Sequence, residues 1–135
     1  MIRQKLGEVQ TFLRKSNLDG WLLFDFRGTN PFVKHIFNHG GSLLTRRWFL
    51  WIPASSEPQV LVHDIEFGSF PRVGYEVHKY NGRETLTREV AKLLGDAKTI
   101  AMEYSPGGNN PYVSKVDAGT MDMIRSVGVN VVSSG

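Results

Sequence analysis

The sequence predicts a single α/β domain built on a mixed β-sheet with helices packed on its faces. Two observations indicate the fold class: strand-like apolar runs alternate with amphipathic helical stretches, and two consecutive strands in the middle form a hairpin. Strands joined by a short turn are antiparallel, so the sheet is not purely parallel. The length of 135 residues is that of one domain, and we expect residues 1–135 to form it.

The first part of the chain predicts a helix, a strand and a second helix. Apolar residues recur at helical spacing from Ile2 to Leu13, and this amphipathic helix ends near Ser16. The run GWLLFDF (20–26) is short, continuous and aromatic, as in a buried strand. Asn30 and Pro31 suit the start of a second helix, which Gly40–Gly41 end.

Residues 46–66 predict the hairpin. The runs RRWFLWIP (46–53) and QVLVHDIE (59–66) are separated by ASSEP, a turn-forming cluster. Alternation places Trp48, Leu50 and Ile52 on one face of the first strand and Phe49 and Trp51 on the other, as in a strand buried on both faces. This interpretation is favoured over a platform for single-stranded nucleic acid.

The last part predicts two further helices and three strands. A short strand covers 75–81, and Asn81 with Glu84 forms a box-like cap for a helix over 82–95. A strand over 99–105 is followed by a helix over 111–128, entered by Asn-Pro and ended by glycine, and a last strand over 129–134.

Composition excludes several classes of protein. With no cysteine, neither disulfides nor a Cys-based metal site is available. The 16 basic residues are interleaved with 13 acidic ones, so the net charge of +3 indicates an ordinary surface and not a nucleic-acid partner. We see neither a membrane span nor a signal peptide, and we expect a cytoplasmic protein with no membrane partner.

The segment TIAMEYSPGGNNP (99–111) has the general form of an anion site, because a strand leads through a glycine-rich loop into a helix. It matches neither the P-loop nor the dinucleotide motif. We expect Glu103, Tyr104 and Gly107–Gly108 to shape a strand-to-helix connection. A small-anion binding domain built on Gly107–Gly108 stays an alternative.

No catalytic set emerges from the residue pattern. His63, Asp64 and Glu66 are the tightest cluster of metal-ligand types, but strand alternation would send His63 and Asp64 to opposite faces. Neither a zinc-protease motif nor a nucleophile elbow is present. We therefore expect no metal site and no catalytic residue in this chain.

Four segments together resemble the N-terminal domain of the creatinase/prolidase family of Xaa-Pro dipeptidases and aminopeptidases. They are the opening helix running into LDGWLLFDF, the segment TNPFVKHIFN, the hairpin LTRRWFLWIPASSEPQVLVHDIE, and the ending TIAMEYSPGGNNPYVSKVDAGTMDMIRSVGVNVVSS. The similarity covers essentially the whole chain. It implies a mixed sheet flanked by helices, with ribonuclease H-like layering.

The resemblance also implies a function that composition cannot supply. Members carry a C-terminal catalytic domain, expected beyond Gly135, that binds two divalent metals (manganese, cobalt or zinc) through two Asp, one His and two Glu. The N-terminal domain supports a homodimer and helps close the partner subunit's active site. The loop NHGGSLLTRR would reach across, which makes His39, Arg46 and Arg47 the expected contacts to a proline-containing peptide.

Two alternatives share the same fold. One is a catalytically silent module that binds proteins or peptides, and the other is the N-terminal domain of a creatine amidinohydrolase-type parent. The presence or absence of the five metal ligands downstream would separate the peptidase from the catalytically silent module.

Overall fold

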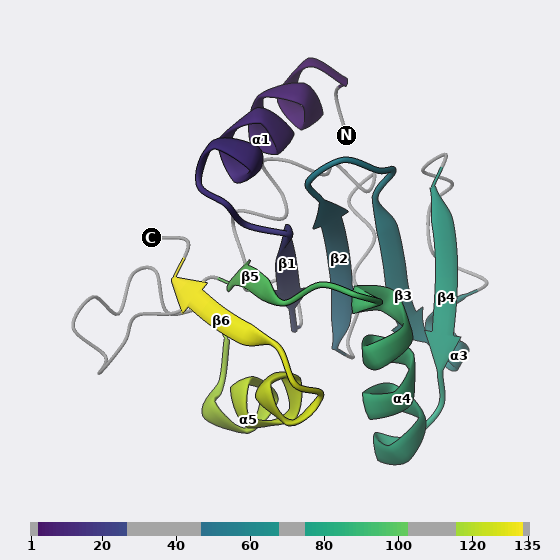
Figure 1. Ribbon diagram of the computed structural model, residues 1–135. Helices are drawn as coiled ribbons and strands as arrows, with labels where there is room; N and C mark the ends of the chain where they lie inside the picture. The colour runs from purple at the N-terminus through teal and green to yellow at the C-terminus, as the bar shows by residue number, and fades with distance from the viewer. Residues whose placement is uncertain (1–2, 27–46, 68–74, 103–115, 134–135) are drawn as a thin grey trace.

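The computed structural model describes residues 3–26, 47–67, 75–102 and 116–133 (Figure 1). In these residues six strands form one sheet in the order β4-β3-β2-β1-β5-β6. In chain order the elements are α1 (Arg3–Lys15), β1 (Gly20–Asp25), β2 (Trp48–Pro53), β3 (Gln59–His63), α3 (Asp64–Phe67), β4 (Glu76–Tyr80), α4 (Arg83–Leu94), β5 (Thr99–Met102), α5 (Ala118–Ser126) and β6 (Asn130–Ser133). The expected α/β fold is confirmed.

The sheet is mixed, as the hairpin predicts. Strand β2 runs antiparallel to both β1 and β3, whereas the pairs β3–β4, β1–β5 and β5–β6 are parallel. The carboxyl ends of β1, β3, β4, β5 and β6 therefore lie at one edge of the sheet, together with the start of β2. We call this the carboxyl edge.

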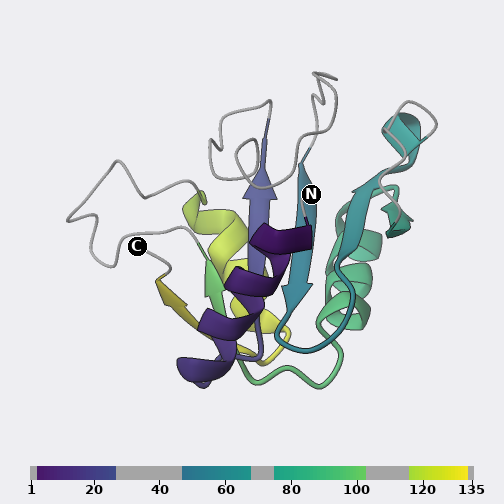
Figure 2. The ribbon, with the colours of Figure 1, turned by 90° about the horizontal axis from the view of Figure 1, so that it is seen from above.

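Helices cover both faces of the sheet (Figures 1 and 2). On one face Leu6 and Leu13 of α1 pack with Trp48, Leu50 and Ile52 of β2. The opposite face carries α4 and α5. Strand β2 is thus buried on both sides, and the predicted alternation of its side chains is confirmed.

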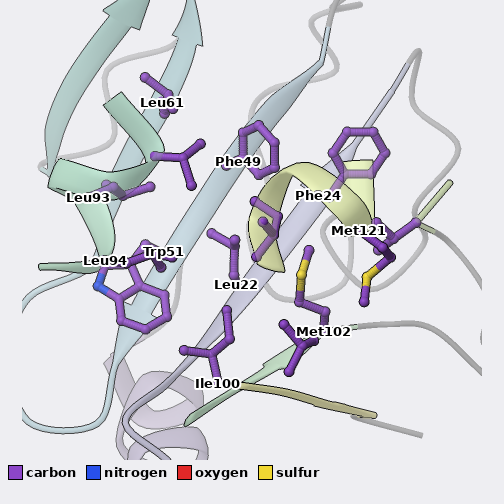
Figure 3. Packing of buried hydrophobic residues seen from close by; sticks show 14 of the residues in the cluster. Leu22, Phe24, Phe49, Trp51, Leu61, Leu93, Leu94, Ile100, Met102 and Met121 are labelled. Carbon is purple, nitrogen blue, oxygen red and sulfur yellow. The ribbon is translucent and has the colours of Figure 1, made fainter. Parts of the chain in front are cut away.

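The larger core cluster lies between the sheet and the pair α4 and α5. In Figure 3, Leu22 and Phe24 of β1 and Phe49 and Trp51 of β2 point into this cluster, where Met121 of α5 joins them. The ring centroids of Phe24 and Phe49 are 5.4 Å apart. Full burial of each such side chain stabilises the fold by about 1.5–3 kcal/mol.

Asp19 lies directly before β1, close to the start of β5 and the turn after β2. Its Oδ2 accepts hydrogen bonds from the backbone amides of Thr99 (2.9 Å) and Lys98 (2.8 Å), and its carbonyl accepts one from the amide of Ala54 (2.9 Å). The amides of Thr99 and Lys98, followed by the charge of Lys98, lower the pKa of the Asp19 carboxyl. Asp19 therefore links the start of β1 to β5 and to the hairpin.

One strand prediction is wrong at its end. The run QVLVHDIE leaves the sheet after His63, and Asp64–Phe67 forms the short helix α3. The amide of Ile65 donates to Nδ1 of His63 at 3.1 Å, which closes a turn at this point. Strand alternation therefore does not apply to Asp64, which belongs to the helix.

The predicted cap of α4 is also wrong. The residue that precedes the helix is Gly82, and no side chain caps its first turn. Asn81 instead accepts a hydrogen bond from the hydroxyl of Thr85, at 2.9 Å. The predicted stop at Gly95 is confirmed, since Gly95 has a φ of 56° and its amide donates to the carbonyl of Ala91.

Helix α5 starts later than predicted. Val116 and Asp117 are not helical, and the extended backbone of Asp117 precedes Ala118, the first helical residue. Asp117 caps the helix by accepting from the amide of Thr120 at 3.0 Å. The predicted stop at Gly128 is confirmed by a φ of 98°. The predicted helix over residues 30–40 lies outside the described residues.

Across the described ranges, no helix combines the length and the hydropathy that crossing a lipid bilayer requires.

Candidate functional site

Arg47 is the one predicted contact residue that the structure describes; His39 and Arg46 lie outside the described residues. Arg47 stands at the carboxyl edge, directly before β2, and its side chain is half-buried. Its backbone carbonyl accepts a hydrogen bond of 2.5 Å from the hydroxyl of Tyr80, at the end of β4. Tyr80 thus fixes the backbone from which the guanidinium extends.

The Arg47 side chain reaches the start of α5. Its Nη1 donates to Oγ1 of Thr120 at 3.4 Å, a long hydrogen bond between residues far apart in the sequence. The fully buried Thr120 hydroxyl in turn donates to Oδ1 of Asp117 at 2.7 Å. These two hydrogen bonds connect Arg47 at the carboxyl edge, through Thr120, to Asp117, which caps α5.

Asp117 is held in its charged form by this arrangement. Burial alone would raise the pKa of the Asp117 carboxyl, but the hydrogen bonds from the Thr120 hydroxyl and amide, with the nearby charge of Arg47, lower it. No ion pair within 4 Å joins Arg47 and Asp117 among the described contacts. The guanidinium therefore keeps donors for another acceptor.

A second polar contact at the carboxyl edge involves a buried acid. Asp25, only 3% exposed, accepts a hydrogen bond of 2.9 Å from Nε1 of Trp48. Sequence reasoning did not single out Asp25, although an acid inside the apolar run GWLLFDF is the signal that could have found it. The pair fixes the end of β1 against the start of β2.

The other candidates from the sequence form no site in the described residues. His63 packs edge-on against Tyr80, with ring centroids 5.2 Å apart, and Asp64 lies 3.7 Å from Nζ of Lys79. No group of three or more metal-ligating side chains occurs in the part of the chain that the structure describes. Glu103, Tyr104 and Gly107–Gly108 fall outside it.

A cavity of about 720 Å³ opens on the face of the sheet that carries α1, between α1 and the strands β5 and β6. Val9, Leu13 and Trp21 are among its apolar lining residues, and Phe12, 66% exposed, lies at it. Its surface is mainly apolar, although polar side chains such as Glu8 and Asn17 also line it.

Neither a family model nor a curated protein matches the sequence of this chain. Solved structures do match its fold. A proline dipeptidase from Streptococcus agalactiae superposes with a TM-score of 0.73 at 15% identity, covering 99% of this chain and 95% of that one. The creatinase/prolidase N-terminal domain of an X-Pro dipeptidase from Streptococcus pyogenes gives 0.70 at 15% identity, over 97% and 93%.

This chain has the creatinase/prolidase N-terminal domain fold. The resemblance noted from the sequence is thereby confirmed in the architecture. Dipeptidase PepE from Mycobacterium ulcerans, at a TM-score of 0.73 and 18% identity, matches 98% of this chain, but only 34% of its own length is covered. The creatinase/prolidase N-terminal fold thus occurs both as a separate structure and as about a third of a longer chain.

Proposed function

We propose that this chain is the N-terminal, non-catalytic domain of a cytoplasmic Xaa-Pro peptidase. The observation that carries the proposal is the match of nearly the whole chain to a domain described as the creatinase/prolidase N-terminal domain of an X-Pro dipeptidase. The longer dipeptidase that the chain covers to about a third supports a parent with further domains.

In this proposal the hydrolytic chemistry belongs to the rest of the parent protein. Two divalent metals, manganese, cobalt or zinc, would activate the attacking water there. The described residues of this chain do not fit such a site, since they contain no group of three metal-ligating side chains. This chain's own contribution is to support a homodimer and to help close the active site of the partner subunit.

Arg47, with Arg46 and His39, is proposed to meet the peptide substrate across the dimer. Arg47 suits this role because Tyr80 holds its backbone carbonyl, while the only hydrogen bond of its guanidinium among the described residues is the long one to Thr120. A guanidinium with spare donors can bind a peptide carboxylate through two parallel hydrogen bonds.

An assay of the intact parent protein tests the proposal, with residues 1–135 alone as a control. Xaa-Pro dipeptides and longer Xaa-Pro peptides are supplied with and without added Mn²⁺. We expect metal-dependent cleavage by the parent and none by residues 1–135, and the preferred peptide length would separate a dipeptidase from an aminopeptidase. If the parent protein cleaves none of these peptides with Mn²⁺ present, a peptide-binding module of the same fold is favoured.

A further inference from the structure

A second cavity lies between α4 and α5, on the face of the sheet opposite α1. Its volume is about 360 Å³. Arg83 and Thr87 line it from α4, Gly119 and Met123 line it from α5, and Arg47 and Asp117 complete it near the carboxyl edge. Two helices, together with Arg47 directly before strand β2, thus contribute to one polar cavity.

Both arginines at this cavity have unused donors. The backbone carbonyl of the exposed Arg83 accepts from the Thr87 hydroxyl at 3.2 Å, but its guanidinium makes no hydrogen bond or ion pair with a described residue. The Arg47 guanidinium makes only the 3.4 Å contact to Thr120 among the described residues. A guanidinium presents its N–H groups in a fixed planar fork that matches a carboxylate. Within the described ranges, most of the Arg47 side-chain donors and all of the Arg83 side-chain donors are therefore available to a ligand.

The Asp117 carboxylate offsets the charge of only one of the two arginines at the cavity. Oδ1 and Oδ2 of Asp117 are engaged by the hydroxyl and the amide of Thr120, at 2.7 Å and 3.0 Å. Of the charged lining residues, Arg47 and Arg83 are positive and Asp117 is negative, which leaves one net positive charge. This balance fits an anion with a single negative charge and disfavours a doubly charged one.

The start of α4 adds to the positive potential, whereas the start of α5 is capped by the Asp117 carboxylate. α4 begins at Arg83 and α5 at Ala118, so both helices start close to residues that line the cavity. The first turn of α4 has no side-chain cap, which leaves its amides to water or to a ligand.

We propose that this cavity binds a small monocarboxylate, whose carboxylate accepts hydrogen bonds from Arg47 and Arg83. A volume of about 360 Å³ is at the small end for ligand pockets, so a compact molecule fits best. Met123 offers an apolar contact to a short alkyl group on the ligand. The site is formed by this chain alone and goes beyond the contact to a partner's substrate proposed above.

A nuclear magnetic resonance titration of the isotope-labelled chain with propionate tests the site. Propionamide has nearly the same shape without the charge, and sodium chloride keeps the ionic strength constant. We expect saturable shifts of the Thr87, Gly119 and Thr120 amides with propionate and none with propionamide. Arg83→Gln should weaken the apparent affinity about tenfold, because a charge-assisted hydrogen bond is lost.

Arg88→Gln is the matched control, because Arg88 is an exposed arginine of the same helix that does not line the cavity. It should bind propionate as the unchanged chain does. Arg47→Gln provides a second test at the other guanidinium, with a well-dispersed spectrum showing that the variant is folded.

Several results would overturn the proposal. They are the absence of saturable shifts with propionate, equal shifts with propionamide, and equal weakening by Arg83→Gln and Arg88→Gln. Saturable binding of inorganic phosphate without binding of propionate would also overturn it, since the assigned ligand class would be wrong.

Discussion

Gly20 lies directly against the indole ring of Trp51: a methyl group at Gly20 would stand 2.2 Å from Cη2 of that ring. Gly20 opens β1 and Trp51 belongs to the neighbouring strand β2, where its side chain is 96% buried in the larger core cluster. The missing side chain at position 20 is thus what lets the indole fill this part of the core.

Gly20→Ala should therefore destabilise the domain by about 1–3 kcal/mol, the usual cost of overpacking a core. Chemical denaturation measures it. The matched control is Gly7→Ala in α1, where a methyl group meets nothing within 4 Å. Alanine is the better helix former, so the control should stabilise the domain by about 0.5–1 kcal/mol. Equal effects of the two changes would contradict the packing account.

Trp48→Phe should cost more than Trp51→Phe. Both indoles come from β2 and are buried, but only Trp48 has a hydrogen bond from Nε1, which goes to the buried Asp25. Removing it takes a donor from a buried carboxylate, and we expect an extra loss of about 1–3 kcal/mol in the free energy of unfolding. Equal losses would mean that the Asp25 contact contributes nothing.

Asp19→Ala should lower stability by about 1 kcal/mol near neutral pH, because two backbone amides lose their acceptor. The pKa of Asp19 is lowered in the folded chain from 3.8, so its stabilising effect is complete above that value and is lost as the pH falls through the lowered pKa.

Denaturation at several pH values measures this dependence. The difference between the unchanged chain and Asp19→Ala should be constant above about pH 5 and should shrink below about pH 4. Asp96→Ala, at an exposed aspartate near the end of α4, is the control. A difference that stays constant down to pH 2 would contradict a role for the ionised carboxyl.

Arg46→Ala with Arg47→Ala in the parent protein should reduce kcat/KM for Xaa-Pro peptides about tenfold or more, if a substrate carboxylate loses a charge-assisted partner. Because Arg47 also contacts Thr120, thermal denaturation must show that the double variant is folded. Arg88→Ala serves as a control for the loss of one exposed positive charge elsewhere on the domain. Unchanged KM and kcat in the double variant would remove these residues from the substrate contact.

The sequence predicted the sheet well and its connections less well. Alternation within RRWFLWIP is a local signal, and the structure confirms that Trp48, Leu50 and Ile52 face one side and Phe49 and Trp51 the other. The predicted end of β3 was wrong because the strand stops at His63, where the amide of Ile65 donates back to the His63 ring and α3 begins.

Contacts between distant residues account for what sequence reasoning missed. Arg47 was selected for its place in a loop, but nothing local indicates that its guanidinium reaches Thr120, 73 residues later. The roles of Asp117 and Arg83 at the cavity likewise depend on how α4 and α5 pack. The periodicity of a sequence predicts on which face of a helix or strand a residue lies, but it does not predict which distant residue it contacts.

If this domain acts on the active site of a partner subunit, two impaired parent proteins should complement each other when they are mixed, and this experiment is the most direct test. One carries Arg46→Ala with Arg47→Ala, and the other lacks a metal ligand in its catalytic domain. After dissociation and reassociation, about half of the dimers are mixed and each has one intact site, so about a quarter of the normal activity should return. Activity that stays at the sum of the two unmixed proteins would contradict the claim.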